Sequence, residues 1–421
     1  MSGSDLEKNN DLPLTETAAP QPVEPVSSQR QQWHAAETPL TEEAPLPAAT
    51  TPAVPEAKDK PFSQHATGLY TVSYLIFFAI LGTLARLGLQ ALTFYTGAPV
   101  VTGVLWANVG GSLVMGFLIE DKNLFREEWG TPPPAPKNHE EATDHAKKHK
   151  AVKKTIPLYI GLTTGFCGCF TSFSSFMRDV FLALANALPD PSLPAGTAIA
   201  SRNGGYSFMA LVAVLLLTVS LSLSALIFGA HLALALTRVT PTVPFALTRR
   251  VLDRVVVVLG WGCWLGAVFL AIWPPDRHDG PDTWRGRAVF ALVFAPLGCL
   301  LRFYVSLYLN SRIPSFPLGT FAVNMIGTAV EAMCYDLQHV SGLGAVVPAA
   351  LTGCQVLQGV MDGFCGSLTT ISTWVAELNG VSRRRHAYVY GVSSMGVGLA
   401  LMVVIMGSLL WTRGFKDPVC G

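Results

Sequence analysis

Long apolar blocks separated by short polar stretches constrain the fold of this chain more than any other feature of its sequence. A block of about 20 apolar residues can cross the roughly 30 Å hydrocarbon core of a membrane as a helix. Only 14% of the residues are charged, whereas soluble domains carry about 25%. The sequence therefore predicts an all-α polytopic membrane protein embedded in a lipid bilayer.

The apolar blocks predict nine transmembrane spans. These are 69–94, 99–120, 156–187, 206–236, 250–274, 287–311, 316–340, 345–378 and 386–412. Residues 1–67 are rich in Pro, Thr, Ala, Glu and Gln and are expected to form a disordered cytoplasmic tail. A hydrophilic loop, 121–155, separates the second span from the third, and residues 413–421 are expected to form a short extracellular tail.

The distribution of charge predicts the orientation of the chain in the membrane. The loops on the N-terminal side carry fifteen Lys and Arg residues, and the loops on the opposite side carry six. Because cytoplasmic loops carry the excess of basic residues, the N-terminus is expected in the cytoplasm and the C-terminus outside the cell. The net charge of +1 argues against a nucleic-acid partner. The eight cysteines include no CxxC pair, so neither a disulfide framework nor a zinc site is expected.

Three short motifs occur twice in the same order. They are Gly82–Arg86 with Gly298–Arg302, Asn108–Ser112 with Asn324–Thr328, and GFCGCFTSFSSF at 165–176 with GFCGSLTTISTW at 363–374. The first two pairs are offset by 216 residues and the third by 198. Residues 68–236 and 287–412 are therefore predicted to be two four-helix repeats.

The segment between the repeats, 237–286, contains the predicted span 250–274. Four spans return a chain to the side where it started, so one additional crossing inverts the second repeat relative to the first. The predicted architecture is a 4+1+4 inverted repeat, an arrangement common in transport proteins, in which solutes cross between the repeats.

The third motif predicts a broken helix in each repeat. Gly165 and Gly168, like Gly363 and Gly366, lie within apolar spans, where glycine permits a break. A break frees backbone carbonyls that need partners in a bilayer, and a bound cation could supply one. Hydroxyl donors follow each break. The alternative is that glycine and hydroxyl residues only allow close helix packing.

Other residues could serve an anion or have a structural role. Asn108 and Asn324 each need a partner within an apolar span, either an anion or another helix. Arg86 and Arg302 could make the two mouths electropositive or could reach lipid headgroups. Ring edges of aromatic side chains carry positive partial charge, so Phe173 could approach an anion or could simply pack in the core.

No carboxylate or histidine chain typical of a proton pump crosses the spans. Glu331, Asp362, Glu377 and His231 occur singly in the sequence, and each is expected to form a local pair or to lie at an interface. The sequence contains no nucleotide-binding glycine loop and no nucleophile with a base, so an enzyme is not expected.

At the repeated motifs the chain resembles the fluoride channel family. Bacterial members are four-span proteins that assemble as antiparallel homodimers, and eukaryotic exporters look like two such units fused through a linker span. The family signature G-x-x-x-R, N-x-x-G-[ST] and GFCGGxTTFSTF is met twice, over about 68–236 and 287–412. The resemblance implies a plasma-membrane channel for passive fluoride export that functions as a monomer.

The resemblance also implies the site residues. A structural Na⁺ would be held by backbone carbonyls of Gly168, Thr171, Gly366 and Thr369. The fluoride pathways would be lined by Asn108, Asn324, Ser174, Ser372, Phe173, Phe176, Ile371, Trp374, Tyr390 and Ser394. The first repeat lacks a clear match to the last two, and Ser220, Ser222 and Ser224 are its candidates.

The two pathways are expected to be unequal. One pairs Phe173 with Trp374, and the other pairs Phe176 with Ile371, which has no ring and departs from the family pattern. We therefore expect one main pore and one degraded pore. The alternatives are a fused transporter for another small solute, of the small multidrug exchanger kind with Glu331 as coupling site, and a membrane scaffold that transports nothing.

Overall fold

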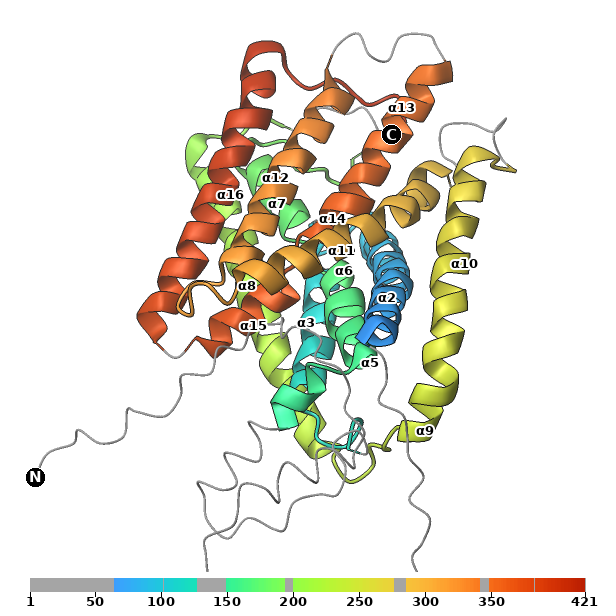
Figure 1. The fold of residues 1–421 in the computed structure, drawn as a ribbon. Coiled ribbons are helices and arrows are strands. Elements are labelled where there is room, and N and C mark those ends of the chain that lie inside the picture. Colours follow the sequence, from blue (N-terminus) through green and yellow to red (C-terminus); the bar gives the residue numbers. More distant parts are fainter. Residues whose placement is uncertain are drawn as a thin grey trace, which may run out of the picture.

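The computed structural model describes residues 64–100, 102–126, 149–193, 200–275, 285–340, 348–381 and 383–420. Every regular element within these ranges is a helix, as the apolar blocks predict (Figure 1). Nearly all of the expected N-terminal tail and most of loop 121–155 lie outside the described residues.

The helices follow the order of the predicted spans. The first half contains α2 (Gln64–Thr93), α3 (Leu105–Glu120), α5 (Pro157–Ile160), η2 (Gly161–Cys167), α6 (Gly168–Phe170), α7 (Phe173–Leu184) and α8 (Gly204–Ala235). The linker contains α9 (Phe245–Leu247), η3 (Thr248–Leu252) and α10 (Asp253–Ile272). The second half contains η4 (Arg285–Val289), α11 (Phe290–Leu309), α12 (Leu318–His339), α13 (Pro348–Gly359), η5 (Val360–Cys365), α14 (Gly366–Leu368), α15 (Ser372–Gly380) and α16 (Arg384–Arg413).

Among the described residues, five helical segments are long and apolar enough to cross a membrane by length and composition. They are His65–Thr93, Gly204–Ala235, Phe245–Ile272, Phe290–Leu309 and Arg384–Arg413. α3 has only 16 residues, and the third and eighth predicted spans are each divided into short pieces. The structure therefore gives an all-helical membrane protein with several apolar spans.

Glycines let two helices of the first half approach closely. A Cβ added to Gly116 of α3 would overlap the carbonyl of Leu226 in α8, and one added to Gly229 would overlap the carbonyl of Leu113. Small residues at such crossings allow direct backbone contact between membrane helices. This packing fixes α8 against α3 without large interlocking side chains.

The linker helix α10 packs against α2 through polar contacts as well as apolar ones (Figure 1). Trp261 Nε1 donates a hydrogen bond to Ser73 Oγ over 3.1 Å. Tyr74 Oη donates to Asp253 Oδ1 over 3.0 Å, and Arg249 Nη1 lies 3.3 Å from the other oxygen of the same carboxylate. These contacts fix the position of the linker helix α10 against α2.

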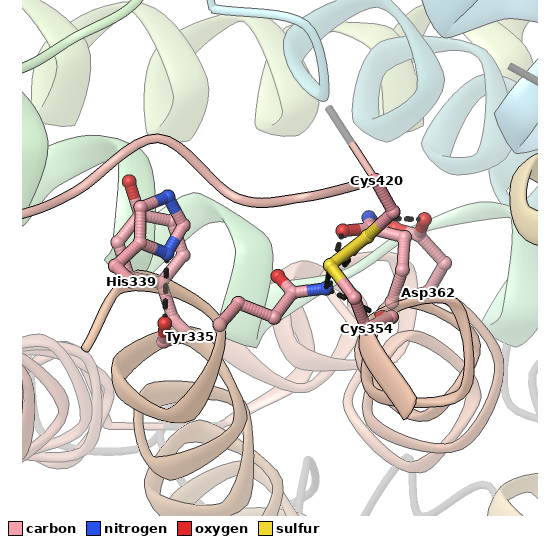
Figure 2. The surroundings of a disulfide bond; sticks show 7 residues. Tyr335, His339, Cys354, Asp362 and Cys420 are labelled. Carbon is pink, nitrogen blue, oxygen red and sulfur yellow. Dashed lines mark hydrogen bonds between the residues drawn. A yellow bond between two sulfur atoms is a disulfide. The ribbon is translucent and has the colours of Figure 1, made fainter. Parts of the chain in front are cut away.

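A disulfide bond between Cys354 of α13 and Cys420 corrects the expectation that no disulfide framework is present (Figure 2). Its cysteines are 66 residues apart in the sequence, so no short spacing motif signals the pair. The tail that it anchors also meets α12, where the Lys416 N–H donates to the His339 carbonyl over 3.0 Å. The C-terminal tail is thereby tied to the end of α12 and to the middle of α13.

Candidate functional site

Two helix breaks meet at the centre of the molecule, one from each half. After α6 the backbone of Thr171 is extended (φ −103°, ψ 150°), and after α14 that of Thr369 is extended in the same way (φ −93°, ψ 155°). Both threonines are fully buried, and α6 contacts α14. The widened π-helical turns η2 and η5 precede the breaks, so both glycine-rich segments interrupt the regular helix as predicted.

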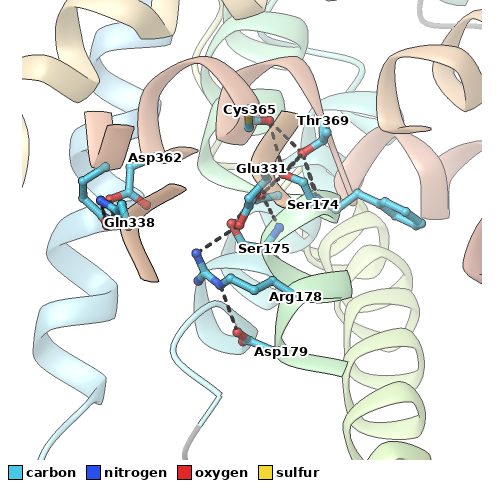
Figure 3. A network of polar contacts seen from close by, with 12 residues as sticks. Ser174, Ser175, Arg178, Asp179, Glu331, Gln338, Asp362, Cys365 and Thr369 are labelled. Carbon is cyan, nitrogen blue, oxygen red and sulfur yellow. Dashed lines mark hydrogen bonds and ion pairs between the residues drawn. The ribbon is translucent and has the colours of Figure 1, made fainter. Parts of the chain in front are cut away.

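Each break threonine caps a helix of the opposite half. Thr369 Oγ1 accepts hydrogen bonds from the backbone N–H groups of Phe173, over 3.2 Å, and Ser174, over 3.1 Å, at the start of α7 (Figure 3). Thr171 Oγ1 makes the equivalent contacts at the start of α15, over 3.2 and 3.1 Å. The first N–H groups of a helix have no partner within that helix. The hydroxyls therefore satisfy these groups and fasten the two halves together.

The two predicted asparagines hold the breaks of their own halves. Asn108 Oδ1 accepts from the backbone N–H of Ser172 over 2.8 Å, and its Nδ2 donates to the carbonyl of the same residue over 3.4 Å. Asn324 makes the matching pair with Thr370, over 2.9 and 3.4 Å. Both amides are fully buried. Of the two alternatives, the structure thus contains the interhelical hydrogen bond, directly beside the break.

Arg86 and Arg302 lie in the protein interior, so neither side chain extends to lipid headgroups, which was one of the two roles expected from the sequence. Both side chains are 0% exposed. Arg302 Nε donates to the Ser367 carbonyl over 2.9 Å, and its Nη2 donates to the Thr164 carbonyl over 2.5 Å. Arg86 Nη2 donates to the carbonyl of Asp362. The guanidinium groups satisfy carbonyls near the breaks, which have no water to bond in an apolar interior.

The residues expected to hold Na⁺ fit a cation only in part. Thr171 and Thr369 follow the C-terminal ends of short helices, which carry negative partial charge. However, a Cβ added to Gly168 or Gly366 would overlap an arginine guanidinium of the opposite half. A fixed positive charge therefore already lies against each glycine and opposes a further cation.

The aromatic residues of the two halves meet beside the breaks. Phe173 lies edge-on to Trp374 with ring centroids 5.7 Å apart, and it contacts Phe176 at 6.0 Å in a similar geometry. All three rings are fully buried, as is Ile371. The structure therefore brings the predicted Phe173–Trp374 pair together. Ile371, which has no ring, also lies in the interior.

Tyr390 and Ser394 on α16 adjoin a buried polar cluster centred on Glu377. Tyr390 Oη donates to Glu377 Oε2 over 2.7 Å, and Thr320 Oγ1 donates to Oε1 over 2.7 Å. Asn310 Nδ2 donates to the same Oε1 over 3.3 Å, and Ser394 Oγ donates to the Tyr390 carbonyl over 2.7 Å. Glu377 thus forms local polar contacts, with partners on α12 and α16 and with Asn310, which directly follows α11.

A second charged cluster joins α7 to α12 (Figure 3). Arg178 Nη1 lies 3.0 Å from Glu331 Oε1, and Arg178 Nε lies 3.7 Å from Asp179 Oδ1. Glu331 is therefore in a local pair, one of the two roles that its sequence left open. Arg178 was not identified from the sequence, because a single arginine in an amphipathic segment resembles an interfacial residue.

Several buried hydroxyl groups have no hydrogen-bond partner among the described residues. They include the side chains of Ser112, Thr164, Ser222 and Thr328. Ser112 and Thr328 are equivalent positions of the two repeats, offset by 216 residues. Of the three serines proposed for α8, Ser222 is buried, whereas Ser220 and Ser224 are exposed. A buried hydroxyl without a partner can donate to a bound or passing anion.

Comparisons with known proteins agree with the duplicated organisation. A family model described as CrcB-like protein, Camphor Resistance, matches residues 73–230 and 289–408. Fluoride export protein 1 of Neurospora crassa is 60% identical over 381 residues, covering 86% of this chain and 71% of the relative. Fluoride export protein 1 of Candida albicans is 35% identical, covering 80% of this chain and 79% of the relative.

A bacterial relative matches only part of the chain. The fluoride-specific ion channel FluC of Pseudomonas paraeruginosa is 33% identical over 134 residues, which cover 31% of this chain but 98% of the relative. No solved structure matches the chain significantly.

The fold and the site define a class of helical membrane protein in which two repeats meet at buried, hydroxyl-capped helix breaks. The chain belongs to the CrcB family, whose members named above are fluoride channels and exporters. The resemblance drawn from the repeated motifs is therefore confirmed, and so is the expectation of a non-enzymatic protein.

Proposed function

We propose that this chain is a channel through which fluoride leaves the cell across the plasma membrane. The observation that carries the proposal is the pair of buried, hydroxyl-rich breaks at which the two family-matched segments meet. Fluoride must lose water to enter such a site and needs replacement donors, which hydroxyls and ring edges can supply. A negative-inside potential favours anion exit by about 2.3 kcal/mol per 100 mV, so passive flow is sufficient.

In the proposed topology, nine spans form two inverted repeats around the linker helix. Disulfides persist in oxidising compartments, which favours an extracellular position for Cys420 and the start of α13. The basic loops favour a cytoplasmic N-terminus, and an odd number of crossings joins the two sides. Because the repeats cap each other within one chain, we propose that the monomer is the functional unit.

We also propose that one pore conducts and the other is degraded. The side that contains Phe173 and Trp374 also adjoins α16, with Tyr390 and Ser394. The other side has Ile371 in place of a ring. An anion there loses one ring edge while it still sheds water, and each lost partner is costly.

Fluoride efflux from liposomes tests the function directly. Purified protein is reconstituted with internal potassium fluoride, and a fluoride electrode follows release after the membrane potential is clamped with valinomycin. We expect fast fluoride release that a large excess of chloride does not reduce. Absence of fluoride release from liposomes that hold folded protein would refute the channel.

A matched pair of substitutions tests the asymmetry. Phe173→Ile should reduce fluoride efflux far more than Phe176→Ile at equal reconstituted protein, because only the first removes a ring from the pathway with Trp374. Equal losses would refute the asymmetry and leave the channel intact.

A further inference from the structure

The ion pair between Arg178 and Glu331 lies on the helix faces that carry predicted pathway residues. Arg178 follows Ser174 by four residues on α7, and Glu331 follows Asn324 by seven on α12. Such spacings place side chains on one face of a helix, one and two turns apart. The pair therefore continues the helix faces that carry the break contacts (Figure 3). Glu331 is displaced from Asn324 toward the end of α12 at His339, which the C-terminal tail contacts.

Only one of the two equivalent positions in the molecule carries this pair. The repeat offset of 198 residues places Ala376 at the position of Arg178, and the offset of 216 places Met115 at the position of Glu331. Helices α3 and α15 contact each other as α7 and α12 do. The Arg178–Glu331 pair is therefore present at one of the two equivalent helix contacts and is not a requirement of the repeat fold.

The exposure of the pair is unequal. The Glu331 side chain is 0% exposed, whereas that of Arg178 is 19% exposed. Asp179, the second carboxylate near Arg178, is 7% exposed, and its Oδ2 atom has no hydrogen-bond partner among the described residues. The guanidinium is thus the most exposed member of the cluster, and the carboxylate of Glu331 is fully buried.

We propose that the Arg178 guanidinium is an anion-binding site at the outer end of the conducting pathway, and that Glu331 competes there with fluoride. This inference rests on the proposed function. A guanidinium has five N–H donors. Two carboxylates lie within 4 Å of the Arg178 guanidinium, Glu331 at Nη1 and Asp179 at Nε. An arriving fluoride replaces Glu331 as the partner of Arg178, and the return of Glu331 releases the fluoride to the outside.

Four variants, measured in the liposome assay, test the competition. Glu331→Gln removes the competing charge at constant shape, so the half-saturating fluoride concentration should fall at least threefold. Met115→Gln, at the equivalent position of the other repeat, is the matched control and should change it less than twofold. Arg178→Gln should lower fluoride flux at least tenfold. The double variant Arg178→Gln with Glu331→Gln should remain at least fivefold below the original protein.

The double variant separates a binding site from a structural ion pair. If the pair only ties α7 to α12, two neutral amides restore the flux and Glu331→Gln leaves the half-saturating concentration unchanged; either result overturns the proposal. The half-saturating fluoride concentration does not depend on how much of the protein folds. A variant that folds poorly therefore still tests the proposal. If the original protein carries no fluoride, the proposed function itself fails, which is a distinct result.

Discussion

Replacing Thr369 by valine should destabilise the protein by removing a cap that one half supplies to the other. The hydroxyl accepts hydrogen bonds from the N–H groups of Phe173 and Ser174 and donates to the Cys365 carbonyl over 2.9 Å. Valine has nearly the same shape, so the substitution removes these hydrogen bonds with little change in packing.

The expected magnitude follows from the groups left without partners. A buried donor without a partner costs about 1–3 kcal/mol, and loss of a helix N-cap costs about 0.5–2 kcal/mol. Because the two N–H groups share one acceptor and can partly relax, we expect Thr369→Val to lower the free energy of unfolding by about 2–4 kcal/mol. Thr171→Val should give a similar loss, since its contacts are equivalent.

Titration with SDS in mixed micelles measures the free energy of unfolding. Thr369→Ser keeps the hydroxyl and should recover most of the stability. Thr412→Val is the matched control, because Thr412 is exposed and its hydroxyl donates only within its own helix. That change should cost about 0.5 kcal/mol or less. The cross-capping argument is wrong if Thr369→Val is as mild as the Thr412 control.

Three further predictions concern the linker, the tail and the loop before α5. Deleting 250–274 while keeping a soluble connector should abolish fluoride resistance of cells, because the second repeat would then start on the wrong side; normal resistance would contradict the inverted repeat. In intact cells, a membrane-impermeant maleimide should label Cys420 only after reduction, and labelling solely in opened cells would contradict the topology. Burial, followed by neighbouring lysines, lowers the pKa of His149 from 6.5 to about 4. As the pH falls, the histidine of the unfolded chain binds a proton at a higher pH than the histidine of the folded chain. The folding stability that neutral His149 contributes is therefore lost as the pH falls from about 6.5 to about 4. Hydrogen exchange at 149–155 should therefore rise beyond its intrinsic rate over that range, and His149→Gln should remove the effect.

The duplicated motifs predicted both helix breaks, and the resemblance to the fluoride channel family implied the pairing of Phe173 with Trp374. Glycines followed by hydroxyl residues in an apolar span have few uses, and two copies at constant offset make coincidence improbable. The fixed order of the motifs also predicted which segments match the family model.

Contacts between the halves could not be predicted, because they depend on how the two repeats dock. The residues joined by the cross-capping bonds are 195 to 201 positions apart. From the sequence alone, Arg86 could lie at a mouth or could reach lipid headgroups. In the folded protein the opposite half offers it a carbonyl in the interior. The Cys354–Cys420 bond needed the same kind of long-range information.

The hydrogen bonds by which each half caps a helix of the other half also have a consequence for synthesis of the chain. The N-terminus of α7 receives its cap from a threonine synthesised 196 residues after Phe173. At roughly 5–20 residues per second, that acceptor is translated about 10–40 s later. During this interval the first half is already in the membrane with two amide groups that only the second half can satisfy. We therefore expect a chain that stalls between the repeats to leave the first two N–H groups of α7 without their acceptor.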